Sequence, residues 1–471
     1  MEKTTTYNQT TIVALLLAGT FIAILNQTLM ITAIPPVMAE MKITANSAQW
    51  LTTVFMLVNG IMIPVSAFLL ERFTTRQLFI SAMSIFAFGT LVAGFAPNFP
   101  ILLLGRMIQS SGAGVMLPLM QTVFLMVFPV EKRGQAMGLV GLVISFAPAI
   151  GPALSGWVTE HYSWRVLFFI ILPIALIDIL IAVKALRNVT EITKPKVDVL
   201  SIVLSSLGFG GLLYGFTSAG NYGWTEQGTI LSLGVGVIAL ALFIFKQLRL
   251  EHPMLEFRVF QYSFFPIAIL IGMITFMGLI GAETLIPLFM QNMRGFTAFE
   301  AGIAILPGAL ITGILAPFIG RIFDRIGARW LVIAGLIIIT AASFLFTNLG
   351  SSTTMTYITI VYSIRMLGLA LVMMPVSTAA LNLLPKRLLP HGAAMDNTMK
   401  MIAASVGTAI LVTVMTTSTQ MAQDRPEIQH PDMYGVNISF IVVAVLSLIS
   451  LLISFFIKDV KPGKMTKTTT R

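Results

Sequence analysis

The sequence predicts an all-α integral membrane protein with 14 transmembrane helices, arranged as two pseudo-symmetric six-helix halves plus two inserted helices. The composition is the first observation behind this prediction. Of the 471 residues, 56% are hydrophobic and 10% are charged, whereas about 25% are charged in soluble domains. The number of long apolar segments is the second observation, and an internal repeat is the third.

Fourteen apolar segments are long enough to cross a bilayer as helices, which takes about 20 residues each. The first is too long for a signal-peptide core and is followed by no small-residue cleavage site, so we expect it to remain as the first span. The segments cover roughly residues 11–34, 48–70, 77–97, 100–128, 134–158, 165–185, 199–218, 228–247, 263–289, 300–320, 330–349, 354–379, 392–416 and 436–457.

The basic residues predict the orientation of these spans. Fourteen spans place both termini on one side, and if that side is the cytoplasm, 22 of the 29 Lys and Arg residues fall in cytoplasmic segments. Positive charge gathers on the cytoplasmic side of membrane proteins. The sequence therefore predicts a multi-pass protein of the cell membrane with cytoplasmic termini. The net charge of +10 then reflects topology, and no nucleic-acid partner is expected.

Several kinds of chemistry are not expected from this sequence. It has no cysteine, and its four histidines are scattered over predicted helix ends and loops without metal-site spacing. A Gly-x-x-x-x-Gly-Lys-Ser/Thr phosphate loop is missing, so we do not expect ATP hydrolysis. Because no nucleophile–base or metal constellation is present, we predict no enzymatic activity, no cofactor and no metal.

Similar residues recur at offsets between 253 and 259 along the chain, which predicts a duplicated unit. Two such six-helix halves are typical of secondary transporters. The predicted domains are residues 1–190 for the first half, 191–258 for the two inserted helices (spans seven and eight), and 259–471 for the second half. The recurring pairs are Gln27 with Glu283, Glu71 with Asp324, and Arg106 with Arg365.

The segment 138–157 combines an apolar run with repeated prolines and small residues, and we expect it to bend within the membrane. Neighbouring helices can satisfy the backbone groups that prolines leave free. Small residues let a partner helix approach closely. The residues concerned are Gly138, Gly141, Ala147, Pro148, Gly151, Pro152 and Gly156.

These motifs together resemble the major facilitator superfamily, in particular its 14-span drug:proton antiporter branch (the EmrB/QacA type), over essentially the whole chain. The cytoplasmic signature is intact after span ten, at Gly320, Asp324, Arg325, Gly327 and Arg329. It is degraded after span two, at Ala67, Glu71, Arg72, Thr74 and Arg76. The antiporter motif of span five is represented by Pro148, Gly151, Pro152 and Gly156. Weaker similarities occur at Arg106, Gln109 and Ser110, at Ser163-Trp164-Arg165, and at Asn397, Lys400 and Gly407.

The resemblance implies a major facilitator fold, transport by alternating access, and a protein that functions as a monomer in the lipid bilayer. One departure concerns span one. Many members carry an aspartate at the position of Asn26. Asn26 does not titrate, so the proton-binding role implied for that aspartate is absent here or has moved.

Coupling to a proton gradient requires an ionisable side chain in a low-dielectric environment, and three acids lie within predicted spans. Glu283 is predicted as the main protonation site, where a proton and a cationic substrate compete; a solvated carboxylate at the outer interface is the alternative. Asp396 precedes Lys400 by one helical turn, which favours an ion pair and leaves a gate as the alternative. Asp178 is interpreted either as an acid that reaches the cytoplasmic interface or as a further coupling site.

The basic residues within and beside the spans suggest two roles. An isolated guanidinium in hydrocarbon is costly, so Arg106 must be paired or face water, and the resemblance implies that it takes part in proton handling. The two signature turns are predicted to close the cytoplasmic side. Their acids complement a helix N-terminus, and their arginines bond carbonyls at the end of the preceding helix. The gating residues are Glu71, Arg72, Arg76, Asp324, Arg325 and Arg329.

The substrate site is predicted from adaptable apolar side chains and buried amides. The chain has 28 Met and 33 Phe, and methionine recurs at promiscuous binding surfaces. For any single one, a place in the core or against lipid is the alternative. The predicted substrate-binding residues are Asn26, Gln27, Gln109, Met116, Met120, Phe276, Met277 and Met373.

The predicted function is proton-coupled efflux of small hydrophobic or cationic drugs across the cytoplasmic membrane. A dedicated exporter of a lipid, an amino acid or another metabolite such as a siderophore is the nearest alternative. A non-transporting sensor is disfavoured by the signature turns and by the ionisable residues within the spans. A channel would need neither the proton dependence nor the cytoplasmic closure.

Overall fold

The computed structural model describes residues 9–190, 192, 193, 195, 197–262 and 264–457. They include 14 helices that are long and apolar enough to cross a membrane, which confirms the predicted all-α membrane fold. The helices are α1 (Gln9–Met41), α2 (Ala45–Arg72), α3 (Thr75–Gly94), α4 (Phe99–Val127), α5 (Arg133–His161), α6 (Val166–Ala185), α7 (Val199–Tyr222), α8 (Gln227–Arg249), α9 (Phe265–Leu288), α10 (Ala298–Ile326), α11 (Arg329–Leu345), α12 (Met355–Asn382), α13 (Leu389–Gln423) and α14 (Pro431–Ser454).

Local sequence explains how the helices on either side of the signature turns begin and end. Thr74 accepts a hydrogen bond from the Gln77 amide while the Gln77 side chain accepts one from Thr74 N–H, a capping box at the start of α3. Thr297 and Glu300 form the same box at the start of α10. Gly327, with φ of 81°, ends α10 in a conformation that favours glycine. Gly327 of the intact signature is therefore the residue that ends α10.

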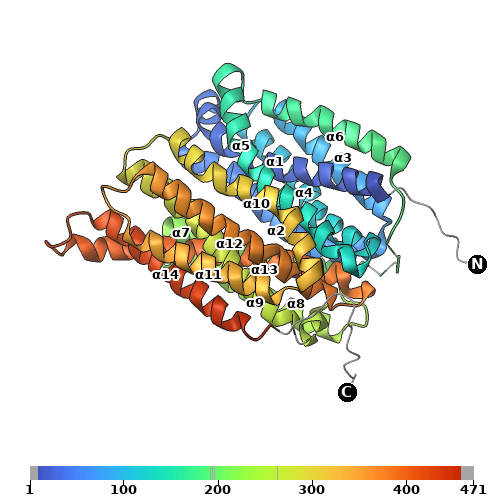
Figure 1. The fold of residues 1–471 in the computed structure, drawn as a ribbon. Coiled ribbons are helices and arrows are strands. Elements are labelled where there is room, and N and C mark those ends of the chain that lie inside the picture. Colours follow the sequence, from blue (N-terminus) through green and yellow to red (C-terminus); the bar gives the residue numbers. More distant parts are fainter. Residues whose placement is uncertain (1–8, 191, 194, 196, 263, 458–471) are drawn as a thin grey trace, which may run out of the picture.

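Helices α1–α6 and α9–α14 occupy opposite sides of the bundle, blue to green and yellow to red in Figure 1. Their main contacts pair α5 with α10 and α2 with α13. The pair α7–α8 packs through α7 against both α2 and α13. The inserted helices therefore cover one edge of the boundary between the two sets, while α5 and α10 meet directly along the other.

Helix α5 is one continuous helix that approaches different partners along its length. A Cβ atom at Gly138 would lie 2.8 Å from Pro317 Cα of α10, and one at Gly151 would lie 2.9 Å from Thr28 Cβ of α1. Close approach at these two positions is confirmed. At Gly156 the prediction of close approach is wrong in this conformation, because no neighbouring atom lies within 4 Å of a Cβ there.

We expect Gly138→Val to weaken the contact between α5 and α10. The larger side chain would meet the backbone of α10, and overpacking of this kind costs about 1–3 kcal/mol. Because the chain has no cysteine, the contact can be followed with a bifunctional thiol reagent in Arg133→Cys/Asn382→Cys, at two positions whose native side chains are joined by a hydrogen bond of 3.1 Å from Arg133 Nη1 to Asn382 Oδ1. We expect at least about a fivefold lower cross-linking rate. Gly156→Val is the matched control, and equal rates in the two variants would contradict the prediction.

Candidate functional site

A buried arginine organises the polar groups within helices α1–α4. Arg106 of α4 is fully buried, and its Nη1 donates to Asn26 Oδ1 at 2.6 Å and to Gln109 Oε1 at 2.8 Å. Gln109 donates in turn to Thr90 Oγ1 of α3 at 2.8 Å. The guanidinium also lies over the Phe55 ring, 4.2 Å from its centroid. Nε donates to the Leu51 carbonyl of α2 at 3.3 Å. The partners that satisfy this buried cation are thus neutral side-chain amides, a backbone carbonyl and an aromatic ring, and Nη2 has no hydrogen-bond partner in the described structure.

Arg365 of α12 has the corresponding place in helices α9–α14. It is buried, and its Nη2 donates to the Gly278 carbonyl of α9 at 2.6 Å. Its Nη1 has no hydrogen-bond partner among the described residues. Glu283, farther along α9, interacts electrostatically with Arg365. The Glu283 side chain is exposed and forms no hydrogen bond or ion pair within the described part of the chain. Its carboxylate is therefore available to a proton or a cation.

The Asp178 side chain of α6 does not extend to the protein surface. Its side chain is buried, and Oδ2 has no hydrogen-bond partner in the part of the chain that the structure describes. A Cβ atom at Gly19 of α1 would lie 3.0 Å from this oxygen and 2.8 Å from Met116 Cε of α4. The interpretation of an acid extended toward the cytoplasmic surface is therefore wrong, and the carboxyl group faces the interior of helices α1–α6.

The other predicted acid forms an ion pair. Lys400 Nζ lies 2.7 Å from Asp396 Oδ2 and donates to Ser377 Oγ of α12 at 2.6 Å. The adjacent Asn397 donates to Gln121 Oε1 of α4 at 2.6 Å. The two charges in this segment of α13 thus neutralise each other, and Asn397 connects the segment to α4 in the other set of helices.

The acid of the intact signature caps a helix of the other set. Asp324, near the end of α10, accepts hydrogen bonds from Gly134 N at 2.7 Å and from Gln135 N at 2.9 Å. These amides belong to the first turn of α5, where N–H groups lack partners within the helix and the dipole favours an anion. A Cβ atom at Gly134 would lie 2.5 Å from the Gly320 carbonyl. Glycine at position 134 therefore permits the contact.

The acid of the degraded signature has a different partner. Glu71 Oε1, at the end of α2, accepts a hydrogen bond from His391 Nε2 of α13 at 2.9 Å. The other ring nitrogen, Nδ1, accepts from the Glu256 backbone N–H at 3.3 Å, which assigns the neutral Nε2–H tautomer to this histidine. Both signature acids thus join the two sets of helices at the predicted cytoplasmic end.

The arginines of the signature turns do not behave as predicted. Arg72 donates to the Pro195 carbonyl in the segment between α6 and α7 at 2.7 Å. Arg76 donates to the Val183 carbonyl near the end of α6. The expected carbonyl partners at the end of the preceding helix are therefore wrong. In the second turn, two arginines make no hydrogen bond within the described residues, namely Arg325 and Arg329.

We expect Asp324→Asn to weaken closure at this end of the bundle. The substitution removes the charge that faces the α5 N-terminus, an interaction that contributes about 1–2 kcal/mol in partly buried sites. The cross-linking rate of the Arg133→Cys/Asn382→Cys pair should fall about tenfold. The matched control is Asp432→Asn in the first turn of α14, which should keep the parental rate. A parental rate in Asp324→Asn would show that the cap does not hold the closed arrangement.

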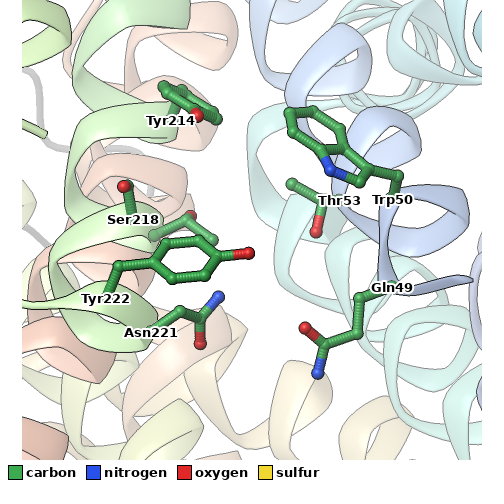
Figure 2. Close-up of a pocket in the computed structure, with 8 residues that line it drawn as sticks. Gln49, Trp50, Thr53, Tyr214, Ser218, Asn221 and Tyr222 are labelled. Carbon is green, nitrogen blue, oxygen red and sulfur yellow. The ribbon is translucent and has the colours of Figure 1, made fainter. Parts of the chain in front are cut away.

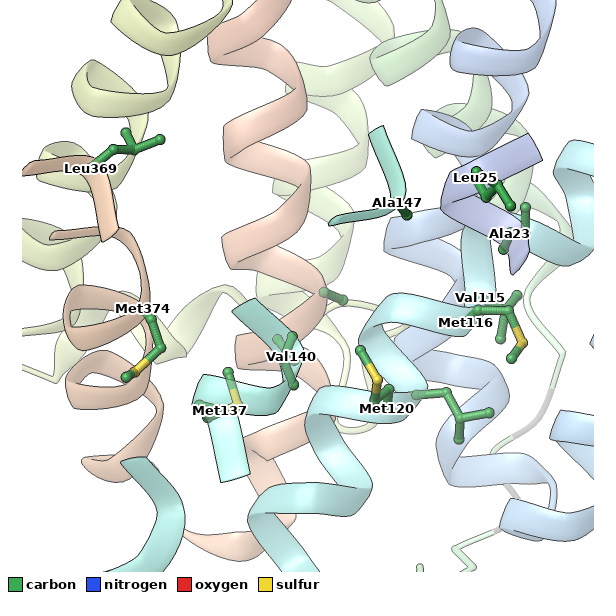
Figure 3. Close-up of a cluster of buried hydrophobic side chains, with 14 of the residues drawn as sticks. Ala23, Leu25, Val115, Met116, Met120, Met137, Val140, Ala147, Leu369 and Met374 are labelled. Atoms are coloured by element: carbon green, nitrogen blue, oxygen red, sulfur yellow. The ribbon is translucent and has the colours of Figure 1, made fainter. Parts of the chain in front are cut away.

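The predicted substrate-binding residues differ in accessibility. Met116 and Met120 are fully buried, and Figure 3 shows them within a cluster of apolar side chains from α1, α4, α5 and α12. Asn26 and Gln109 are held by Arg106. In this conformation these four side chains are internal. The half-buried members of the predicted set are Gln27, Phe276, Met277 and Met373.

A polar pocket lies between α2 and α7 at their predicted outer ends, and Figure 2 shows the residues that line it. Gln49, Trp50 and Thr53 line one side, and Tyr214 and Tyr222 line the other. The Trp50 and Tyr214 rings stack with centroids 5.8 Å apart. The cavity of ≈ 20 Å³ has room for about one water molecule. This pocket is therefore a tight joint between α2 and an inserted helix, and it is too small for a drug.

Two polar clusters were missed by sequence reasoning. His391 stood apart from every motif, although it joins Glu71 to α13. The Ser-Trp-Arg motif before α6 was noted only as a resemblance, whereas Trp164 and Arg165 both bind Glu40 at the end of α1. No group of three or more His, Asp or Glu side chains suited to a metal occurs among the described residues.

Comparisons with known proteins place this arrangement in context. The family model of the Major Facilitator Superfamily matches residues 16–408. A Bacillus subtilis (strain 168) protein named uncharacterized MFS-type transporter YcnB is 55% identical over 96% of this chain and 96% of its own. The lincomycin resistance protein LmrB of Listeria monocytogenes serovar 1/2a is 39% identical over 96% of this chain and 97% of its own.

A solved structure has a similar fold. The crystal structure of the human organic anion transporter MFSD10 matches 94% of this chain and 99% of its own chain, with a TM-score of 0.68. The two sequences are 13% identical. At this identity the likeness concerns the fold alone.

Proposed function

Because the chain belongs to the major facilitator superfamily and has its fold, we propose that it exports small hydrophobic or cationic drugs across the cell membrane in exchange for protons. The relatives named for lincomycin resistance support a drug as the substrate class. The observation that carries the proton-coupling part is the exposed carboxylate of Glu283 within a membrane-spanning helix. An acid in this position is by default a functional group.

The conformation supports a definite stage of an alternating-access cycle. Asp324, Glu71 and Asn397 join the two sets of helices at the predicted cytoplasmic end. Glu283, toward the predicted outer end of α9, is exposed. This arrangement corresponds to an outward-facing state, in which Glu283 takes up a proton and a cationic substrate leaves. The cytoplasmic contacts then break, so that the proton leaves inward and a new substrate binds.

The halves that move in this cycle are proposed to be residues 1–190 and 259–471, with both termini in the cytoplasm. The two halves contact each other directly through α5 and α10 and through α2 and α13, and α7 packs against both α2 and α13.

We propose that the close packing of α5 near Pro148 and Pro152 seals the outer side in the inward-facing state. Asp178 and Asp396 are proposed to tune coupling, because both are buried in this conformation. A single chain suffices for the cycle.

Transport into inverted membrane vesicles tests the proposal. With an imposed acidic lumen, we expect accumulation of a fluorescent cationic dye and of radiolabelled lincomycin, and collapse of both by a protonophore. Vesicles without the protein are the control. Flux that ignores the pH gradient would contradict proton coupling and leave export intact, whereas no flux of either compound would contradict drug export.

A further inference from the structure

A second cavity lies far from the boundary between the two sets of helices, at the predicted cytoplasmic end of α3 and α6. Its volume is ≈ 530 Å³. The side chains around it come from the start of α3 and the segment after α6. They are Thr74, Arg76, Gln77, Ile80, Ser81, Leu186, Arg187 and Asn188. None of the transport residues proposed above other than Arg76 lines this cavity.

The cavity is electropositive. Arg76 and Arg187 are its charged lining residues, and both are exposed. Arg187 forms no ion pair or hydrogen bond with another described residue. Lys184, exposed in the last turn of α6, adds a third cation nearby. The positive end of the α3 dipole points to the same place. The described lining therefore presents two guanidinium groups and no carboxylate to a ligand.

The walls of the cavity are fixed by hydrogen bonds between α3 and the segment after α6. Thr75 N donates to Asn188 Oδ1 at 2.9 Å, and the Thr75 and Thr190 hydroxyl groups lie 3.1 Å apart. Asn188 Nδ2 donates to the Thr190 carbonyl at 2.8 Å. Arg76 is held against α6 by its bond to the Val183 carbonyl. The cavity is thus preformed and does not depend on a ligand for its shape.

Apolar side chains continue from the cavity along the outside of both helices. Phe88 of α3 and Leu180 of α6 are 57% and 64% exposed, and Ile85 and Ile177 are exposed beside them. The candidate spans begin at Thr75 and end at Ala185. The cavity therefore lies at the level of lipid headgroups, above a surface that faces acyl chains.

We propose that this cavity binds the phosphate of an anionic phospholipid, with the acyl chains along the exposed faces of α3 and α6. Arginine forms bidentate, charge-assisted hydrogen bonds with phosphate. Gln77, Ser81 and Asn188 offer further polar groups to a glycerol headgroup. The continuity of a basic cavity with a lipid-facing surface favours a lipid over a soluble phosphate. This inference goes beyond the proposed transport function and does not require it.

Native mass spectrometry of the purified, delipidated full chain tests the proposal, with phosphatidylglycerol, phosphatidylcholine and inorganic phosphate as separate probes. We expect the wild type to retain phosphatidylglycerol in preference to phosphatidylcholine. Arg187→Gln should weaken phosphatidylglycerol binding about fivefold, the effect of one basic side chain at an anionic lipid surface. Arg187→Lys should restore part of the binding, because it returns the positive charge and lacks the bidentate geometry. Arg387→Gln, which removes an exposed arginine before α13, is the matched control.

Three outcomes would overturn the assignment. Equal binding of the two lipids would show that the headgroup charge is not recognised. Equal losses in Arg187→Gln and Arg387→Gln would show a diffuse charge effect and no site at this cavity. Retention of inorganic phosphate without a preference between lipids would assign the cavity to a soluble anion. Because the readout is binding, a protein that fails to transport drugs still tests the lipid site.

Discussion

Glu283→Gln is expected to abolish proton-driven accumulation of substrate, with at least about a tenfold lower initial rate in inverted vesicles that have an acidic lumen. Glutamine keeps the size of the side chain and mimics its protonated form, so the variant should lose both the exchangeable proton and the negative charge that attracts a cationic substrate. A tenfold loss corresponds to about 1.4 kcal/mol.

The position of Glu283 gives the physical reason. It is exposed, it lacks a hydrogen bond or ion pair within the described residues, and Arg365 interacts with it electrostatically. A carboxylate without a fixed partner can exchange a proton for a cationic substrate, whereas one held in an ion pair, such as Asp396, must first lose that partner. The mechanism therefore needs a free acid, and α9 supplies one.

A matched substitution provides the control. Glu300→Gln makes the same chemical change at the start of α10, where glutamine also satisfies a capping box, and it should leave coupled transport unchanged. Full coupled transport by Glu283→Gln would contradict the assignment. If Asp178→Asn or Asp396→Asn abolished coupling instead, the protonation site would move to that residue.

The membrane fold was predictable because its signals are local. A run of about 20 apolar residues identifies a span without knowledge of its neighbours, and the 14 predicted segments correspond to the 14 observed helices. The Pro-rich segment 138–157 likewise indicated close packing from its small residues. The sequence did not indicate which helix each glycine would contact. Gly138 meets α10, Gly151 meets α1, and Gly156 meets nothing within 4 Å.

Polar partners were harder to predict because they depend on tertiary contacts. The spacing between Asp396 and Lys400 is one helical turn, so their ion pair followed from sequence. Glu71 and His391 are 320 positions apart, and no local pattern connects them. Arg72 donates to a carbonyl in the segment after α6, and Arg76 donates to a carbonyl of α6 itself. The sequence had predicted carbonyl partners at the end of the preceding helix for both arginines. Residue types indicated which side chains need partners, and only the fold identifies those partners.

Asn26→Ala is expected to be the most destabilising of these substitutions. Asn26 Oδ1 accepts a 2.6 Å hydrogen bond from Arg106, which is fully buried. A hydrogen bond to a charged group contributes about 1.5–3 kcal/mol, and the cost is at the upper end here because Arg106 Nη2 already lacks a partner in the described structure. Thermal unfolding in detergent, followed by scanning fluorimetry, should show a lower midpoint by several degrees.

Two further variants separate the possible reasons for this effect. Gln27→Ala removes the neighbouring half-buried amide and should change the midpoint little. Asn26→Asp keeps the acceptor oxygen and adds the charge found at this position in many members of the superfamily. Since an aspartate would pair directly with Arg106, we expect Asn26→Asp to be at least as stable as the wild type at neutral pH and to lose that advantage only as the pH falls below about 4, the ordinary pKa of an aspartate. If Asn26→Ala unfolded at the same temperature as Gln27→Ala, the amide would not be what satisfies the buried guanidinium. A water molecule would then have to accept the hydrogen bond of Arg106 in place of the Asn26 amide, and water would have to enter the interior of helices α1–α4.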